Sequence, residues 1–260
     1  MKIKIENLGI IKKAELELGK LTIICGENNT GKTYVTYALY GFLEKWHELM
    51  EIETPEKDIV TLMEKGTVDI DISPYIKKAS DILKDCCNKY SKNLASVFAS
   101  SEKYFESSQF SMDLDSSEIK TEENYDTNIS SSKTTIFKIS KGAGKSHIQI
   151  TLLTEKENID LPNFIIGETI SSSIKTVAFS HTLPRPFIAS AERTGAAIFQ
   201  KELDILKNRM LENIHGSKAI KPLELVLDTI KGYDYDYALP VKDNVDFVRN
   251  LSEISKKESF

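Results

Sequence analysis

Eight consecutive residues, Gly26 to Thr33, constrain the fold of this chain more than any other feature. Their sequence, Gly-Glu-Asn-Asn-Thr-Gly-Lys-Thr, matches the phosphate-binding P-loop pattern, two glycines with four residues between them and then Lys and Ser/Thr, without a mismatch. A short β-rich apolar run at 21–25 precedes the loop and an apolar helical stretch at 34–43 follows it. The sequence therefore predicts a buried strand, a tight loop and a helix that together bind a nucleoside triphosphate.

Each residue type in this loop suits phosphate or its metal ion. Glycines can adopt positive φ and bring the backbone close to phosphate oxygens, so that successive N–H groups converge on the anion at a helix N-terminus. We expect Lys32 to reach the β and γ phosphates and the Thr33 hydroxyl to bind Mg²⁺. An ordinary glycine-rich loop is the alternative interpretation. The predicted cofactor-binding residues are Gly26, Glu27, Asn28, Asn29, Thr30, Gly31, Lys32 and Thr33.

Composition limits the size class, the binding partners and the cellular location that we expect for this protein. The chain has 260 residues, 40% of them hydrophobic, which suits one large domain or a domain with a sizeable insertion. A net charge of −5 gives no overall basic field for nucleic acid, although a local patch stays possible. Cys86 and Cys87 are adjacent and poorly suited to forming a disulfide with each other. The spacing of the three cysteines, with Cys25, does not resemble that of a zinc site, so we expect the protein to reside in the reducing cytoplasm. No apolar run approaches the roughly 20 residues of a membrane helix.

The N-terminal part shows clear periodicity. Residues 1–18 alternate apolar and charged side chains around a break at Leu8-Gly9, which predicts two half-buried strands. The helix after the loop is expected to run from Tyr34 to about Met50, with Trp46 as a packing anchor rather than a platform for a ligand.

A variable insertion is expected to follow. Segments 57–65 and 74–106 have helix-compatible apolar spacing. Residues 101–133 carry eight acidic side chains against three lysines, together with many serines, and we interpret them as a solvated, mobile loop. An acidic segment that binds a partner is the alternative interpretation.

Strands are expected again at 134–140 and 147–154, joined by a hairpin turn. The turn contains Gly-Ala-Gly-Lys-Ser at 142–146, which resembles the end of a second P-loop. Ile139 stands where the required leading glycine would be, and a strand follows instead of a helix, so we favour a simple turn.

The last part is expected to contain a strand at 174–179 and another that ends near Ser190, followed by the polar cluster 191–195. Helical spacing then covers 196–214 and roughly 223–230.

Two segments carry a family resemblance. The first segment resembles the opening of ABC-type ATPase heads of the SMC/RecF/OLD-like group, which are often labelled AAA-family ATPases. It comprises Ile3-Lys4-Ile5-Glu6-Asn7-Leu8-Gly9, Ala14-Glu15-Leu16-Glu17-Leu18 and the run 21–33. The segment 187–195, Phe-Ile-Ala-Ser-Ala-Glu-Arg-Thr-Gly, is similar to a strand-end segment of bacterial members. The resemblance implies an α/β P-loop NTPase of the ABC-ATPase head type, with a mixed β-layer, an antiparallel N-terminal hairpin and a helical insertion.

The resemblance also implies a division of the chain. Residues 1–50 would form the hairpin and P-loop core, 51–133 the helical and acidic insertion, and 134–260 the remaining strands and a helical lobe. Family heads also need a signature serine motif, an apolar strand ending in Asp-Glu and a switch histidine. The nearest acidic strand is 225–228, but Thr229 stands where the catalytic Glu should be. We therefore expect the N-terminal half of a longer ATPase, with catalytic residues unknown.

By resemblance, the cofactors are ATP and Mg²⁺, and ATP would join two heads as a homodimer. The missing C-terminal half or a partner chain would complete the site, and nucleic acid is a partner only by family analogy. Glu192 and Arg193 are candidates for contacting the γ-phosphate region or a partner, with a structural ion pair as the alternative. Lys12 and Lys13 are candidates for the base or ribose side, with solvated hairpin lysines as the alternative.

Three functions remain open at this stage. The first is an ATP-binding and, in the complete protein, ATP-hydrolysing head, acting in DNA maintenance or antiviral defence. The second is a non-hydrolysing nucleotide-binding module that dimerises or regulates. The third is a GTPase or small-molecule kinase, against which the guanine-reading Asn-Lys-x-Asp motif is absent. No catalytic triad, carboxylate pair or metal cluster stands out, and the four histidines share no ligand-like spacing.

Overall fold

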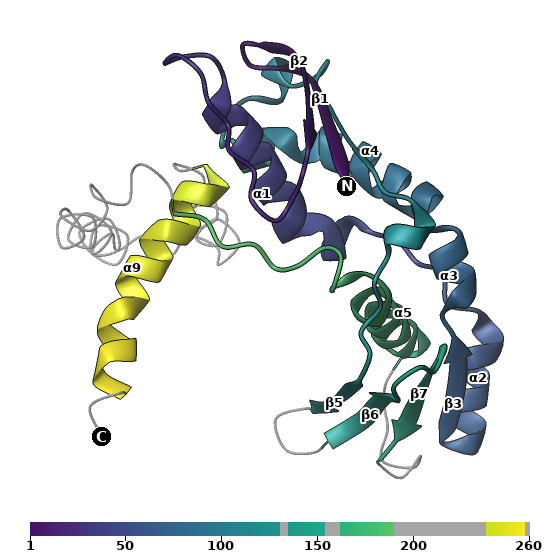
Figure 1. Ribbon diagram of the computed structural model, residues 1–260. Helices are drawn as coiled ribbons and strands as arrows, with labels where there is room; N and C mark the ends of the chain where they lie inside the picture. The colour runs from purple at the N-terminus through teal and green to yellow at the C-terminus, as the bar shows by residue number, and fades with distance from the viewer. Residues whose placement is uncertain (131–134, 154–161, 190–237, 258–260) are drawn as a thin grey trace, which may run out of the picture.

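The structure is a computed structural model that describes residues 1–130, 135–153, 162–189 and 238–257 (Figure 1). The expected helices at 196–214 and 223–230, the polar cluster 191–195 and the acidic-strand candidate 225–228 lie outside the described residues.

The first sheet is built on the N-terminal hairpin. Strand β1 pairs antiparallel with β2 on one edge and with β4 on the other, and the register sets Ile3 opposite both Leu16 and Met112. Ile3, Ile5 and Leu8 are fully buried, while the charged residues between them lie on the outer face. The predicted hairpin is confirmed. The strand bounds are β1 (Lys2–Leu8), β2 (Ile11–Glu17) and β4 (Gln109–Asp113).

Two long helices, α1 (Lys32–Leu49) and α4 (Ala79–Val97), cover the inner face of this sheet. Phe42 of α1 stacks on Phe110 of β4 with ring centroids 4.9 Å apart. The two helices lie in contact, and the Tyr90 hydroxyl of α4 donates a 2.6 Å hydrogen bond to the Ala38 carbonyl of α1. Trp46 is buried, which confirms it as a packing anchor.

The second sheet has the strand order β3-β7-β6-β5 and is antiparallel throughout. Helix α2 packs against β3 and β7, and α5 lies beside α2. The predicted hairpin of β6 and β7 is confirmed, and residues 142–146 form its turn. The bounds are β3 (Thr67–Asp71), β5 (Tyr125–Ser130), β6 (Thr135–Lys141), β7 (His147–Leu152), α2 (Glu56–Lys65) and α5 (Asn163–Phe179).

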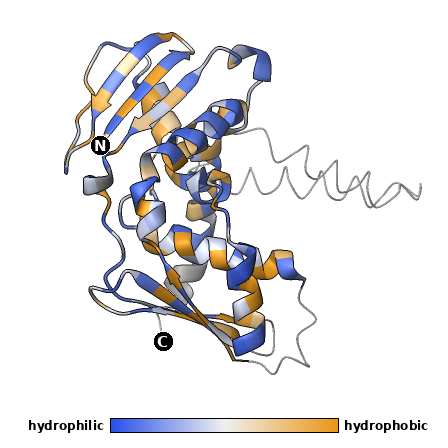
Figure 2. Ribbon diagram, turned by 90° about the vertical axis from the view of Figure 1, so that its right-hand side faces the viewer, coloured by the Kyte–Doolittle hydropathy of each residue, from blue (hydrophilic) through white to orange (hydrophobic). Residues whose placement is uncertain are grey.

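The two sheets lie at opposite ends of the described body, with the helices between them (Figures 1 and 2). One continuous apolar core joins them, from Ile3 of β1 to Ile150 of β7. Strands in Figure 2 alternate between hydrophobic and hydrophilic residues, as expected when each sheet buries one face. The remaining elements are α3 (Ser73–Lys77), the short 3₁₀ helices η1 (Glu102–Tyr104) and η2 (Ser116–Glu118), and α9 (Leu239–Lys257).

Helix α9 lies against α1, more than 200 positions earlier in the chain. The Tyr40 hydroxyl donates to the Asp243 carboxylate at 2.5 Å. The buried Asn244 amide donates to the Ile188 carbonyl at 2.9 Å, so α9 also holds the extended segment that follows α5. Among the described residues, no helix combines the length and apolar character needed to cross a membrane.

The interpretation of residues 101–133 as a solvated loop was wrong. Residues 109–113 form β4, in which Phe110 and Met112 are buried, and residues 125–130 form β5. The acidic charge is carried by the exposed positions, as at Asp113, whose carboxylate pairs with Lys4 at 2.7 Å. Only Asp113 and Asp126 of the eight acidic residues lie in these strands, and the other six lie in the connecting segments and short 3₁₀ helices beside them.

Three expected strands were also wrong. Residues 174–179 form the last turns of α5, because the buried positions Ile166, Ile170, Ile174 and Val177 recur with helical spacing over a longer window. Residues 184–189 form no regular element. The run 21–25 is also not assigned to a strand, and Leu21 and Ile23 are 81% and 74% exposed. No strand in the described part of the chain pairs with it.

Residues 51–133 contribute strands to both sheets, since β3 pairs with β7 and β4 with β1. We retain the three-part division at 50 and 133 as a proposal about the order of segments along the chain.

Candidate functional site

The candidate loop, residues 26–33, leads from the extended segment 18–25 into the N-terminus of α1. Asn29 and Gly31 both adopt left-handed backbone conformations, with φ of 62° and 91°. Gly31 is the N-cap of α1. A turn of this kind aims consecutive N–H groups toward one side of the backbone, which is the geometry that binds an anion.

The β1–β2 turn fixes the position of this loop. A Cβ added to Gly31 would lie 2.6 Å from Cγ1 of Ile11, and one added to Gly9 would lie 2.6 Å from Cε1 of Tyr34. Both distances are shorter than real Cβ contacts. The hairpin and the loop therefore approach each other closely, and glycine is needed on both sides of the contact.

Lys32 folds back over its own loop. Its ammonium donates to the Gly26 carbonyl at 2.8 Å and also to the Glu27 carbonyl, while the Thr30 hydroxyl donates to the Glu27 carbonyl at 2.9 Å. These bonds hold the loop in its curve. A phosphate group would offer the ammonium stronger, charged acceptors in place of the carbonyls.

The N-terminus of α1 is open to solvent. It has no side-chain cap and no acidic residue in its first turn, so its free N–H groups and the helix dipole leave this end positive. Thr33 is exposed, and its hydroxyl has no hydrogen bond to the described protein residues. The sequence of this loop therefore leaves both N–H donors and a hydroxyl available.

A hollow of about 300 Å³ lies at this helix end. Six of the eight predicted residues, 28–33, line it together with Ile10 and Tyr34. Gly26 and Glu27 do not line it, but their carbonyls hold Lys32. None of the lining residues is acidic, so the hollow suits an anion.

Sequence reasoning missed Ile10 and Tyr34. Ile10 is 53% exposed although it is apolar, because it forms the tip of the β1–β2 turn. The signal was present, since Ile10 directly follows the Leu8-Gly9 break that was interpreted only as a turn. Lys12, which was predicted to lie on the base or ribose side, is exposed on β2 and does not line the hollow. Lys13 pairs with Glu15 at 2.9 Å.

The remaining candidates lie elsewhere. Glu192 and Arg193 fall outside the described residues. Within the described ranges, no group of three or more His, Cys, Asp or Glu side chains could hold a metal ion. Cys86 and Cys87 are buried free thiols, and burial raises the pKa of each to about 12, so neither is a nucleophile at neutral pH.

Comparison with known proteins gave one result. No curated protein and no solved structure matches the chain. A family model described as the AAA ATPase domain matches residues 1–234, which include both sheets, the candidate loop and α1. Because the matched residues make up most of the chain, this protein belongs to the AAA ATPase domain family.

Proposed function

We propose that the chain binds ATP with Mg²⁺ at residues 26–33, as the nucleotide-binding part of an ATPase head. The observation that carries this proposal is the coincidence of an exact P-loop pattern with an uncapped, acid-free helix N-terminus at a hollow. Family membership supports the same function independently of the geometry.

The residues present fit the metal–nucleotide complex. The N–H groups of residues 28–33 would hold the phosphates, Lys32 would exchange its carbonyl acceptors for phosphate oxygens, and the Thr33 hydroxyl would bind Mg²⁺. The bound Mg²⁺ would neutralise charge that develops on the phosphates. Ile10 at the rim would cover one side of the nucleotide.

We further propose that this head is of the SMC/OLD-like type and acts in DNA maintenance or anti-phage defence. The N-terminal hairpin that packs on the loop supports this assignment. The exposed side chains of Leu21 and Ile23 beside the loop support completion of the head by a further strand, from elsewhere in the protein or from a partner chain. A homodimer joined through the nucleotide is part of the same proposal, because heads of the group that the chain resembles are joined in this way.

A non-hydrolysing, regulatory nucleotide-binding module is the second candidate function. No acidic side chain lies among the described residues that line the hollow, which favours this candidate, because hydrolysis needs groups that hold the metal and orient water.

Titration of the chain with ATP and Mg²⁺, beside Lys32→Ala, tests the binding function. The variant loses charge-assisted hydrogen bonds worth about 1.5–3 kcal/mol, so we expect its ATP affinity to fall by about 10-fold to 100-fold. Lys145→Ala is the matched control, because Lys145 ends the similar Gly-Ala-Gly-Lys sequence but lies in a hairpin turn. Equal affinity of wild type and Lys32→Ala would refute the site.

Phosphate release measured in the same samples separates the two candidate functions. Turnover that depends on Lys32 supports an ATPase. Binding that is lost in Lys32→Ala, without turnover in the wild type, supports the regulatory module.

A further inference from the structure

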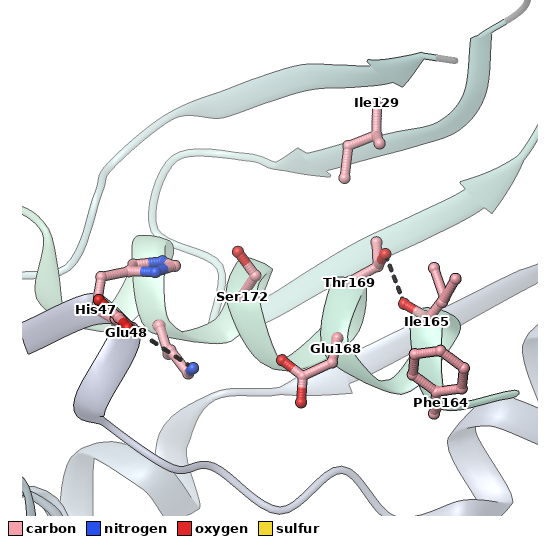
Figure 3. Close-up of a pocket in the computed structure, with 9 residues that line it drawn as sticks. His47, Glu48, Ile129, Phe164, Ile165, Glu168, Thr169 and Ser172 are labelled. Carbon is pink, nitrogen blue, oxygen red and sulfur yellow. Dashed lines mark hydrogen bonds between the residues drawn. The ribbon is translucent and has the colours of Figure 1, made fainter. Parts of the chain in front are cut away.

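A larger cavity, of about 470 Å³, lies at the opposite end of α1 from the loop (Figure 3). Its floor is one face of α5, from Phe164 to Lys175. One end is formed by His47 in the last turn of α1, and the opposite wall carries Ile129 of β5. Its volume falls within the range of small-molecule sites, roughly 300–1,000 Å³.

The segment that precedes β5 is hydrogen-bonded to the C-terminal end of α5. The Glu122 amide donates to the Val177 carbonyl at 3.0 Å, and the Ser180 hydroxyl donates to the Glu122 carboxylate at 3.1 Å. Strand β5 then continues toward the other end of α5 and pairs with β6 along one edge. No described strand pairs with its other edge, so space remains between Ile129 and the exposed face of α5.

Lys175 places a buried positive charge in this cavity. The residue is only 7% exposed, and among the described residues it forms no salt bridge. Its ammonium donates one hydrogen bond, of 3.2 Å, to the His47 carbonyl at the end of α1. An ammonium has three N–H donors, and a buried charge without a counter-ion is costly, so Lys175 is suited to receive an anion.

Other charged groups act on Lys175 without forming a salt bridge with it. Burial lowers the pKa of its ammonium, while the charges of Glu168 and Glu51 raise it. Burial, and then the Lys175 charge, lower the pKa of His47, so the imidazole is neutral at neutral pH. Glu48 and Glu168 also line the cavity, but both are exposed and are therefore screened by water. The lining thus contains one buried ammonium and two exposed carboxylates.

The rest of the lining is suited to an apolar body. Phe164 is 70% exposed at the open end, and Ile129 faces α5 from the opposite wall (Figure 3). The Ser172 side chain lies one helical turn from Lys175 on the same face of α5. The cavity thus has a hydroxyl and an ammonium at one end and an apolar surface at the other.

We propose that this cavity binds a small carboxylate with an apolar chain. The carboxylate lies beside Lys175 and Ser172, and the chain lies against Phe164 and Ile129. This site goes beyond the proposed nucleotide-binding function and shares no lining residue with the loop. A free aliphatic acid and the C-terminal carboxylate of a peptide have this chemistry in common.

Calorimetric titration of the full chain with octanoate tests the proposal, with octanol as the uncharged ligand control. Lys175→Met retains the length of the side chain and removes the charge, and we expect it to weaken octanoate binding by tenfold or more. Lys84→Met, on the exposed surface of α4, should leave the affinity unchanged. Absence of octanoate and peptide binding, or equal affinity in Lys175→Met, would overturn the proposal.

A second variant and a peptide ligand complete the experiment. Phe164→Ser changes an exposed side chain and should weaken octanoate binding without disturbing the fold, which circular dichroism verifies. N-acetyl-valyl-leucine, compared with its amide, tests the peptide source. Preference for octanoate identifies a free acid as the ligand, and preference for the dipeptide acid over its amide identifies a peptide C-terminus. The Lys32→Ala variant should bind octanoate normally, so failure of the nucleotide site leaves this test intact.

Discussion

Single glycines decide how closely the hairpin can approach the nucleotide loop. Gly31 combines a left-handed backbone with a missing Cβ that would collide with Ile11. The P-loop pattern predicted that glycine was needed at this position, and the reason given was access of the backbone to phosphate. The structure adds a second reason, because the same position must also accommodate the packed side chain of a neighbouring strand.

Gly31→Ala separates these two requirements. We expect a loss of about 2–5 kcal/mol in the free energy of unfolding, the sum of a left-handed alanine and an overpacked contact. Gly66→Ala is the matched control, since Gly66 has a φ of 74° but nothing within 4 Å of its added Cβ, and it should lose only about 1 kcal/mol. Urea denaturation measures both values, and equal losses would show that the contact with Ile11 is unimportant.

At the scale of elements, β4 is the strand that completes the first sheet. Phe110 stacks on Phe42 and meets Tyr90 edge-on at 5.1 Å, so it joins β4 to both long helices. Phe110→Ala should lower the free energy of unfolding by about 3–5 kcal/mol, the usual cost of removing a buried phenyl ring. Tyr104→Ala, at a 64% exposed position in the same segment, should change it by less than about 0.5 kcal/mol. Similar small effects at both positions would show that residues 109–113 do not form a packed strand.

Elements with long, regular periodicity could be predicted from the sequence. The N-terminal hairpin, α1, α2, α4 and the β6–β7 hairpin all follow from local alternation or helical spacing. The sequence could not predict β4 in the same way, since its partner β1 lies more than 100 residues away and the charged residues before and after this short strand dominate the local composition. The prediction of a strand at 174–179 failed for a different reason. A short run rich in β-branched residues fits a helix as well as a strand, and only the helical spacing of the residues before it identifies the helix.

The functional residues likewise divide into those that local sequence predicts and those that depend on distant contacts. The loop residues were recognised because they are consecutive, whereas Ile10 and the cavity at Lys175 depend on contacts between distant segments. No local pattern marks a buried lysine that forms no salt bridge within the described part of the chain.

At the scale of the whole molecule, the proposed dimer makes the assembly depend on nucleotide. We expect the chain to be monomeric without ligand and to show a larger sedimenting species with ATP and Mg²⁺, since nucleotide would lie between two heads. Analytical ultracentrifugation measures this change, and Lys32→Ala should abolish it. A wild-type sedimentation coefficient that stays constant at saturating ATP would exclude the nucleotide-joined dimer.

Helix α1 begins at the candidate loop, touches α9 through Tyr40 and ends where Lys175 meets the His47 carbonyl. Its 18 residues span about 27 Å at a rise of ~1.5 Å per residue. The helix therefore connects the loop, which ends at Gly31, with the cavity at Lys175. A tilt of about 5° at that end displaces the far end by roughly 2 Å at this length. A displacement of that size would break the hydrogen bond from Lys175 to the His47 carbonyl, so we expect a movement at the loop to alter the cavity at the other end of α1.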